Sequence, residues 1–442
     1  MKTLALLTTC AFLLAQHALA QDTAPAVAQD TSGNAIAGGP PQPNAAATPP
    51  VQVGAEGPLA RWLTMNTFSF SYRWRDLADS NNYRLFDTGQ ERTLIDGRFK
   101  LDAEGKYSVN FHVSSGRYFN WAYADSIGKG FGDSATGSLG RYTPAELGQL
   151  YGAIAADPVG TADITNHLAS RGWETYFRQL YFSATPIKQV TLEYGGLGIE
   201  RGVNTEITSY DEDGYLAGER LRLRDPQHLY FDQIAVTYGY LGDYFVPNFF
   251  DRGDRLAQSN YHQFLVEKNF GHRLKASADY TWQNRTDTLR EAVLVKVPES
   301  RILDSARLEL YQRTDAVSFQ GETFGTGAGF AFTGSKTFAK KFQLEGGYDT
   351  VDQNYADLAG SRVLAISFAF NGDSYSIGPR FFTRANYRID PYFTLFGFYT
   401  HALATDYYML NRQGMNFGLT VDLKNFLDNK FHLGIAPVKV DN

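Results

Sequence analysis

An alternation of apolar and polar residues is the feature that most constrains what this chain can fold into. Every second residue from position 68 is aromatic: Phe68, Phe70, Tyr72 and Trp74. The residues around and between them are polar or charged: Thr67, Ser69, Ser71, Arg73 and Arg75. Because side chains of a β-strand point alternately to the two faces of a sheet, the segment predicts a strand with one apolar and one polar face.

The same pattern returns along most of the chain, for example in residues 92–102, 107–114, 274–283 and 415–424. The sequence contains 32 Phe and 27 Tyr residues, yet no apolar run after the N-terminus is long enough for a membrane helix. Lipid-facing strands that alternate with lumen residues give this composition. We therefore predict an all-β protein, a transmembrane antiparallel barrel of roughly 16 to 18 strands. The barrel is expected over residues 59–442, with long outer loops, one containing a short helix.

The N-terminus has the features of a secretory signal. Lys2 precedes an apolar run from Leu4 to Leu14, and Ala18-Leu19-Ala20 provides a small-residue cleavage site. This predicts a signal peptide over residues 1–20 that is removed after Ala20. Residues 21–58 are rich in Ala, Pro, Gln and Asn and predict a disordered periplasmic linker. Cys10, the only cysteine, lies in the signal, so the mature chain would form no internal disulfide.

The segments between the predicted strands fall into two classes. Short turns are expected at residues 184–186, 269–272, 339–341 and 389–391, and long loops at 76–91, 118–172, 200–218 and 248–259. Outer-membrane barrels have short periplasmic turns and longer extracellular loops, so this division is expected. The last strand is predicted at residues 431–440.

Loop 118–172 contains the predicted helix. Thr143-Pro144-Ala145-Glu146 has the spacing of a capping box with proline at the first helical position. Apolar residues follow at helical spacing: Leu147, Leu150, Tyr151 and Ile154. A helix this short needs something to pack against. It would enter the pore as a constriction, cover its mouth as a lid, or pack on neighbouring outer loops.

Basic residues recur on the polar faces of several predicted strands. The candidate pore-lining set is Arg98, Lys100, Arg307, Arg313, Arg380, Arg384 and Arg388. A charge facing lipid near the bilayer midplane costs about 2–4 kcal/mol, so these side chains should point into the lumen. They would attract anions, or they would pair with lumen acids, for which the candidates are Asp96, Glu193, Asp279 and Asp422. The net charge of −6 favours pairing. Arg220, Arg222 and Arg224 also alternate, in a segment with a weaker strand pattern.

Other chemistry has weaker support. Asn110, His112 and Ser114 share one strand face, but side chains two residues apart rarely reach hydrogen-bond distance, and a polar lumen lining explains them. We therefore predict that the protein is not an enzyme. The acidic segment 211–214 suits a solvated turn better than a cation site. No histidine spacing indicates a metal, no cofactor motif is present, and an acidic chain without a long basic block is not expected to bind nucleic acid.

With these features the chain resembles Gram-negative outer-membrane porin-like barrels over residues 60–440. Segment 175–201 is also loosely similar to the paired strands of alginate-export barrels, which are eighteen-stranded and lined with arginines. Where those proteins often have Gly-Arg-Gln, this chain has Tyr194-Gly195-Gly196-Leu197. Such barrels usually end in an aromatic residue that the insertion machinery recognises, whereas this sequence ends in Val440-Asp441-Asn442.

The predicted function is a channel in the cell outer membrane for passive diffusion of small hydrophilic solutes, narrowed by loop 118–172. Expected partners are the lipid bilayer, lipopolysaccharide and the outer-membrane assembly machinery. Trimers are common among porin-like barrels, although no sequence feature indicates an oligomer. Two alternatives stay open: a dedicated carbohydrate or polysaccharide conduit, and a closed barrel with a structural or adhesive role.

Overall fold

The structure is a computed structural model, and it describes the barrel strands, most of their short turns and part of the loops. The described residues are 62–78, 84–117, 173–205, 207–209, 215–224, 229–241, 248–283, 286–298, 300–313, 317–319, 322–324, 326–351, 378–403 and 413–431. The predicted signal peptide, the predicted linker and loop 118–172 lie outside these residues. So do the helix positions predicted in that loop: Glu146, Leu147, Leu150, Tyr151 and Ile154.

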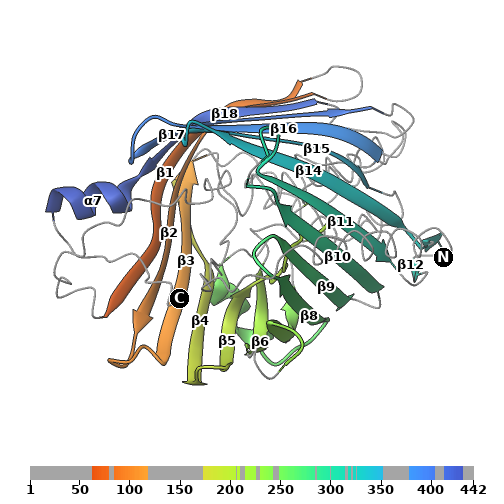
Figure 1. Cartoon of the computed structure of the whole chain (residues 1–442). Helices are drawn as coiled ribbons and strands as arrows, with labels where there is room; N and C mark the ends of the chain where they lie inside the picture. Colours follow the sequence, from red (N-terminus) through yellow and green to blue (C-terminus); the bar gives the residue numbers. More distant parts are fainter. Residues whose placement is uncertain are drawn as a thin grey trace, which may run out of the picture. The chain divides into compact units, whose positions relative to one another are not determined.

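Sixteen of the described strands close into an antiparallel barrel (Figure 1). They are β1 (Leu63–Ala78), β2 (Arg84–Lys100), β3 (Tyr107–Arg117), β4 (Trp173–Ile187), β5 (Val190–Gly198), β6 (Tyr215–Leu223), β7 (Gln233–Leu241), β8 (Tyr261–Phe270), β9 (Leu274–Gln283), β10 (Thr286–Lys296), β11 (Ser305–Arg313), β14 (Ala328–Phe338), β15 (Phe342–Val351), β16 (Gly378–Arg388), β17 (Phe393–Ala402) and β18 (Gln413–Asp422). Strands β12 (Val317–Phe319) and β13 (Glu322–Phe324) form a separate hairpin, so β11 pairs with β14. The predicted barrel is confirmed.

The barrel has no open edge. Each strand pairs with its neighbour in the order of the barrel, and β1 pairs with β18 from Ser69 opposite Asp422 to Ala78 opposite Gln413. A closed antiparallel sheet satisfies the backbone hydrogen bonds of every strand within the sheet, which is what a wall in contact with lipid requires.

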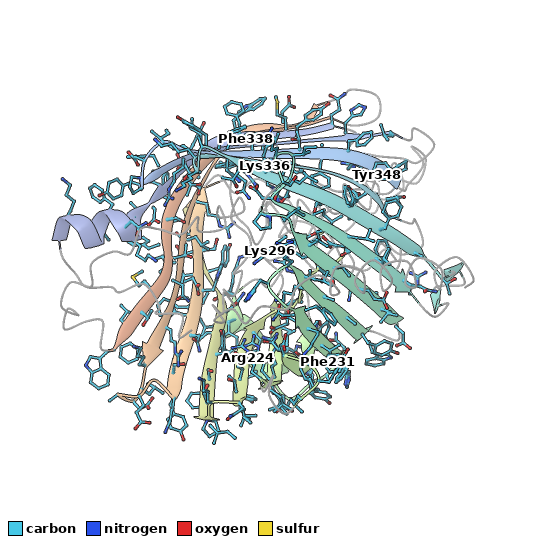
Figure 2. All side chains as sticks on the ribbon, in the orientation of Figure 1. Arg224, Phe231, Lys296, Lys336, Phe338 and Tyr348 are labelled. Atoms are coloured by element: carbon cyan, nitrogen blue, oxygen red, sulfur yellow. The ribbon has the colours of Figure 1, made fainter. Side chains whose placement is uncertain are left out.

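The two faces of the wall differ as the alternation predicts (Figure 2). Tyr72, Phe381 and Phe417 are each about half exposed on the outer face. Ser69 and Ser71, on the other face of β1, are buried, and so are Gln90 and Arg92 on β2 and Asn416 on β18, which share their face. An exterior of exposed apolar rings around a polar interior is the reverse of a soluble protein and is typical of a transmembrane barrel.

Most short turns lie at one end of the barrel and the longest connections at the other, although the two-residue connection 284–285 between β9 and β10 is at the long-loop end. Turns at residues 101–106, 188–189, 271–273, 339–341 and 389–392 join strands at one end, which we call the short-turn end. Two predicted boundaries are wrong. The expected loop 76–91 is largely strand, because β1 runs to Ala78 and β2 begins at Arg84. The turn expected at 184–186 lies at 188–189, because β4 continues to Ile187 through a register irregularity.

The C-terminal part also differs from the prediction. Strand β18 ends at Asp422, and helix α7 (Leu423–Phe431) follows directly. Strand β18 already pairs with β1, and position 431, where the last strand was predicted to begin, is the end of the helix. The rest of that predicted strand, residues 432–440, lies outside the described residues. Among the described residues, no helix combines the length and the apolar character needed to cross a membrane.

One connection folds over the outside of the wall at the long-loop end. The 3-10 helix η1 (Phe249–Arg255) contacts β4 and β6. The rings of Phe250 and Phe177 meet edge to face at 5.3 Å. Phe249 lies so close to Gly196 that a Cβ there would be 2.5 Å from its ring. Glycine at position 196 is therefore what allows η1 to lie flat against β5.

Candidate functional site in the barrel interior

The interior of the barrel is lined by charged side chains that are almost completely removed from solvent. Six arginines are at most 4% exposed: Arg92, Arg178, Arg220, Arg290, Arg313 and Arg380. Five acids are at most 7% exposed: Asp96, Glu193, Asp279, Glu309 and Asp349. Burying an ion is costly unless an opposite charge or several hydrogen bonds compensate, so the arrangement of these groups decides the field inside the barrel.

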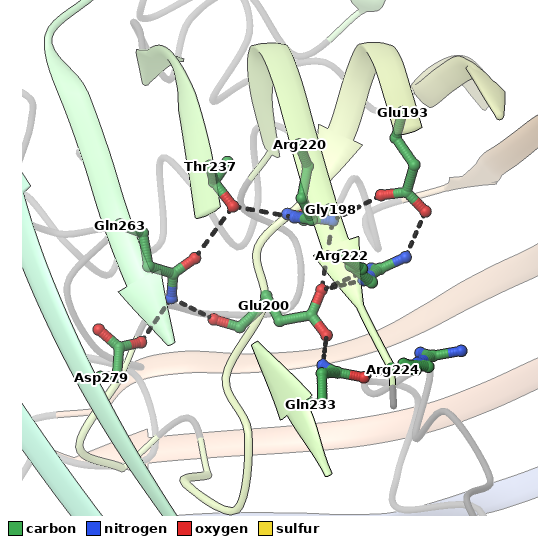
Figure 3. A network of polar contacts seen from close by, with 10 residues as sticks. All are labelled: Glu193, Gly198, Glu200, Arg220, Arg222, Arg224, Gln233, Thr237, Gln263 and Asp279. Carbon is green, nitrogen blue, oxygen red and sulfur yellow. Dashed lines mark hydrogen bonds and ion pairs between the residues drawn. The ribbon is translucent and has the colours of Figure 1, made fainter. Parts of the chain in front are cut away.

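The densest cluster joins β5 and β6 (Figure 3). Arg220 Nη1 lies 3.1 Å from Glu193 Oε2 and 3.4 Å from Glu200 Oε2. Arg222 forms ion pairs with the same two acids, at 2.5 Å from Glu200 and closely with Glu193. Arg220 Nε also donates to Thr237 Oγ1 on β7, at 3.0 Å. Two arginines and two glutamates therefore neutralise each other.

Polar contacts extend this cluster along the wall in both directions. Gln233 Nε2 donates to Glu200 Oε1 at 2.9 Å, and Arg224 Nε donates to Gln233 Oε1 at 2.8 Å. On the other side, Gln263 Nε2 donates to both the Glu200 backbone carbonyl, at 2.7 Å, and Asp279 Oδ2. Arg290 then pairs with Asp279 at 3.5 Å. The network is continuous from β5 to β10.

Glu200 lies in the connection that follows β5. Burial alone would raise the pKa of its carboxyl, but the guanidinium groups of Arg222 and Arg220 outweigh that effect and lower the pKa to about 2. Glu200 therefore stays ionised at neutral pH and keeps its charge-assisted hydrogen bonds to Arg222.

The connection after β5 runs along the inner wall, and we call residues 199–205 and 207–209 the inner loop. Val203 N donates to Ser277 Oγ on β9 at 2.8 Å. Gly202 has a φ of 61°, and a Cβ there would lie 2.8 Å from Ser277 Cβ and 2.9 Å from Leu265 Cδ1. Glycine is needed at 202 both for this backbone conformation and for the close approach to β8 and β9.

Glu309 on β11 holds the middle of the inner loop. Its carboxylate accepts hydrogen bonds from Thr205 N at 2.8 Å, Thr205 Oγ1 at 2.7 Å and Thr208 Oγ1 at 2.6 Å. Arg290 Nε donates to the backbone carbonyl of Thr208 at 2.9 Å. Glu309 is fully buried, so these bonds satisfy a carboxylate that has no contact with water.

The last described part of the inner loop packs on the far side of the interior. Ile207 is 2% exposed and forms an apolar cluster with Ala331, Phe382 and Phe398 on β14, β16 and β17. The inner loop thus leaves β5 and contacts the inner faces of β8 to β11, β14, β16 and β17. A segment with these contacts lies inside the barrel.

The predicted basic residues lie along the whole length of the interior and do not form a single ring. Arg98, Lys100 and Arg388 are near the short-turn end, whereas Arg313 and Arg380 are near the ends of β11 and β16 that face the long loops. Arg384 lies between, 3.2 Å from Glu345 and with its guanidinium 5.5 Å from the ring centre of Phe398. Arg307 is 3.9 Å from Glu309, and Arg380 donates to Thr400 at 3.2 Å.

Sequence reasoning missed two features of the described interior. It placed Arg220, Arg222 and Arg224 in a weak strand pattern, yet β6 brings Arg220 and Arg222 onto Glu193 and Glu200. It also predicted residues 200–218 as an outer loop and gave the constricting role to loop 118–172. Arginine alternation was a usable signal for the first feature. The second depends on contacts with residues about a hundred positions away, such as Thr205 with Glu309.

The remaining candidates show no catalytic or metal-binding arrangement. His112 and Ser114 are buried on the inner face of β3, and Asn110 donates to Ser108 at 3.3 Å. In the described part of the chain, no hydrogen bond joins His112 to Ser114, and His112 Nδ1 has no hydrogen-bond partner. No group of three His, Cys, Asp or Glu residues suited to a metal occurs within the described residues.

Comparison with known proteins found similar barrels at very low sequence identity. OccAB1 of Acinetobacter baumannii is 9% identical, with 83% of this chain and 99% of that chain covered and a TM-score of 0.48. OmpF of Salmonella typhi, in complex with daunomycin, is 9% identical over 82% of this chain and 98% of that one, with a TM-score of 0.45. A triple mutant of the Rhodopseudomonas blastica porin is 8% identical over 81% of this chain and 99% of that one, with a TM-score of 0.43.

No family model and no curated protein matches the chain. Similarity at this level does not define a family, so the fold rests on the strand registers themselves. The resemblance to alginate-export barrels is unsupported, because the wall has sixteen strands where that resemblance implies eighteen.

Proposed function

We propose that this protein is a channel in the cell outer membrane for the passive diffusion of small hydrophilic solutes. The proposal depends on one observation, the contrast between an apolar exterior and an interior lined by charged groups. Such an interior lets a hydrated solute pass the membrane without losing its hydrogen-bonding partners. The proposal includes a cleaved signal peptide over residues 1–20, a periplasmic linker over 21–58 and a short-turn end that faces the periplasm.

The inner loop supports a size limit within this channel. It is held to Glu309 and to the apolar cluster around Ile207, so we expect it to narrow the path on the side of β8 to β17. Arg220, Arg222 and Arg290 each form an ion pair with an acid. Because these charges neutralise one another, we expect the channel to discriminate only weakly between anions and cations. A dedicated carbohydrate conduit stays a prediction, and blocking of the ion current by added oligosaccharides would favour it.

Conductance measurements test the proposal. The mature protein reconstituted in planar bilayers should give discrete single-channel steps, and deletion of residues 140–158 should enlarge them if loop 118–172 also narrows the pore. A folded barrel that gives no steps would contradict the proposed channel and favour a closed structural or adhesin barrel. Unchanged steps in the deletion variant would leave the constriction to the inner loop alone.

Charge reversal tests whether Arg384 and Arg388 line the ion path. The double variant Arg384→Glu/Arg388→Glu places a new carboxylate next to Glu345, which now pairs with Arg384 at 3.2 Å. The reversal potential in a KCl gradient should shift toward cation selectivity, because anions lose two attractive charges and meet two repulsive ones. Lys340→Glu, an exposed turn position, is the matched control. An unchanged reversal potential in the double variant would remove both residues from the ion path.

A further inference from the structure

Helix α7 (Leu423–Phe431) begins where the lipid-facing wall ends at the short-turn end. Its first turn is fixed by Asp422, whose carboxylate accepts hydrogen bonds from Asn425 N and Asn425 Nδ2, both at 2.8 Å. Asp422 N in turn donates to the Tyr392 backbone carbonyl at 2.7 Å. A capping acid that is itself the last residue of a strand leaves no flexible linker between wall and helix.

Two further contacts set the direction of α7. The rings of Phe426 and Tyr392 meet edge to face, with centroids 6.0 Å apart. Lys424 Nζ donates to the backbone carbonyl of Asn66 at 3.0 Å, at the register shift in β1. In Figure 1 the helix projects away from the ring of strands. It therefore lies outside the ring of strands, attached to the wall at its first turns.

The apolar side of α7 continues the lipid-facing surface. Leu423, Phe426 and Leu427 have the spacing of one helix face, and Phe426 is 38% exposed. At the same end of the barrel, the outer face of β16 and the start of β17 present exposed apolar side chains: Tyr387, Ile389, Phe393 and Leu395. An exposed ring adjoining these residues would extend the same apolar surface beyond the strands.

The charges of α7 suit a membrane surface. The helix contains two lysines and one aspartate, and Lys430 in its last turn is exposed. By helical spacing Lys430 lies on the same side as Leu423, Phe426 and Leu427, one turn after Phe426. A lysine in this position lays its apolar stem along the lipid boundary and extends its ammonium to the headgroups, and a short amphipathic helix of this kind lies in the plane of the interface. Lysines near that surface are attracted to anionic phospholipids.

We propose that α7 is a lipid-binding element that lies in the headgroup region of the phospholipid leaflet at the short-turn end, with Phe426 at the acyl boundary. The inference goes beyond the proposed channel and rests only on the membrane location of the wall. It assigns α7 a role in fixing the depth and tilt of the barrel, a role that conduction does not require.

Site-directed spin labelling tests this location. Because Cys10 is the only cysteine and lies in the predicted signal, the mature chain accepts single cysteines without other changes. Nitroxide labels at Phe426→Cys, Leu395→Cys and Glu104→Cys would be compared in the full mature protein, in vesicles containing phosphatidylglycerol. Leu395 marks the lipid-facing wall, and Glu104, which is exposed in the turn after β2, marks water. Oxygen concentrates among acyl chains, so strong relaxation of a label by oxygen shows that the label is in the membrane. A nickel chelate stays in water, so strong relaxation by the chelate shows that the label is in water.

The label at 426 should resemble the label at 395, with strong oxygen and weak nickel relaxation. If the label at 426 were as accessible to the nickel chelate as the label at 104, α7 would lie in water. If the label at 426 were protected from both reagents, protein would cover α7, for example a second copy of this chain. Either result overturns the inference. The Leu395 label separates the two proposals: if it too behaves like Glu104, the membrane location of the wall fails, and otherwise only the location of α7 does.

Discussion

Replacing Thr205 and Thr208 together with valine is expected to raise the single-channel conductance of the barrel by about a factor of two, because the inner loop would lose both of its hydroxyl hydrogen bonds to Glu309 and be held less firmly against the wall. Both hydroxyls donate to the buried carboxylate of Glu309, at 2.7 and 2.6 Å. Hydrogen bonds to a charged group contribute about 1.5–3 kcal/mol each. Among the described residues, the double variant would leave Glu309 with the backbone N–H of Thr205 and the more distant Arg307.

Valine is chosen because it keeps the shape of threonine and leaves the net charge of the lumen unchanged. Thr333→Val is the matched control, since Thr333 is a buried threonine on the inner face of β14, opposite Arg307, and is not among the residues that hold the described part of the inner loop. Conductance would be measured at fixed salt in planar bilayers, together with the size of polyethylene glycols that enter the pore. If the double variant conducted like the control, the remaining contacts, namely the packing of Ile207 and the backbone hydrogen bonds with Ser277 and Arg290, would hold the loop, or the loop would not limit the current.

The wall of this barrel could be predicted from the sequence because its signal is local. Alternation with a period of two fixes which side chains face lipid, and Phe70 and Tyr72 point outward while Ser69 and Ser71 point inward, as their parity requires. Arg313 and Arg380 were placed in the lumen by the same argument, and both are fully buried there. The cost of a charge in lipid makes this inference strong even when the rest of a strand is unclear.

The position of the inner loop could not be predicted in this way. Thr205 and Thr208 are ordinary loop residues in the sequence, and their role appears only when β11 brings Glu309 beside them. The weak pattern of β6 has a similar cause. The outward positions of β6 include the acid Glu219 and the small residue Ala217, so they do not form a continuous series of large apolar residues.

The end of the chain illustrates a different error. Residues 415–424 alternate, and the alternation was expected to continue through residue 424. The structure ends the strand at Asp422, because its carboxylate caps the first turn of α7. Leu423, Phe426 and Leu427 already had helical spacing, and an aspartate directly before such a run is a helix-start signal. The capacity of Asp422 to cap a helix would have located this boundary better than the alternation of apolar and polar residues did.

Glu193→Leu is expected to lower the free energy of unfolding by about 3–5 kcal/mol, because it leaves part of a buried network without its counter-charge. Glu193 is 5% exposed and pairs with both Arg220 and Arg222, and Glu200 alone would then face two guanidinium groups. The uncompensated positive charge would also attract anions into the lumen, so the reversal potential should shift toward anion selectivity.

The double variant Glu193→Leu/Arg220→Leu separates pairing from packing. It leaves Arg222 with Glu200 at 2.5 Å, a balanced pair, so it should recover most of the lost stability and most of the selectivity shift. Urea unfolding in detergent micelles and reversal potentials in bilayers measure the two effects on the same variants. A single variant as stable as the wild type would mean that water or ions compensate Arg220 and Arg222 in the absence of Glu193. A double variant no better than the single one would mean that the loss comes from packing around position 193, since a charge imbalance would have been relieved.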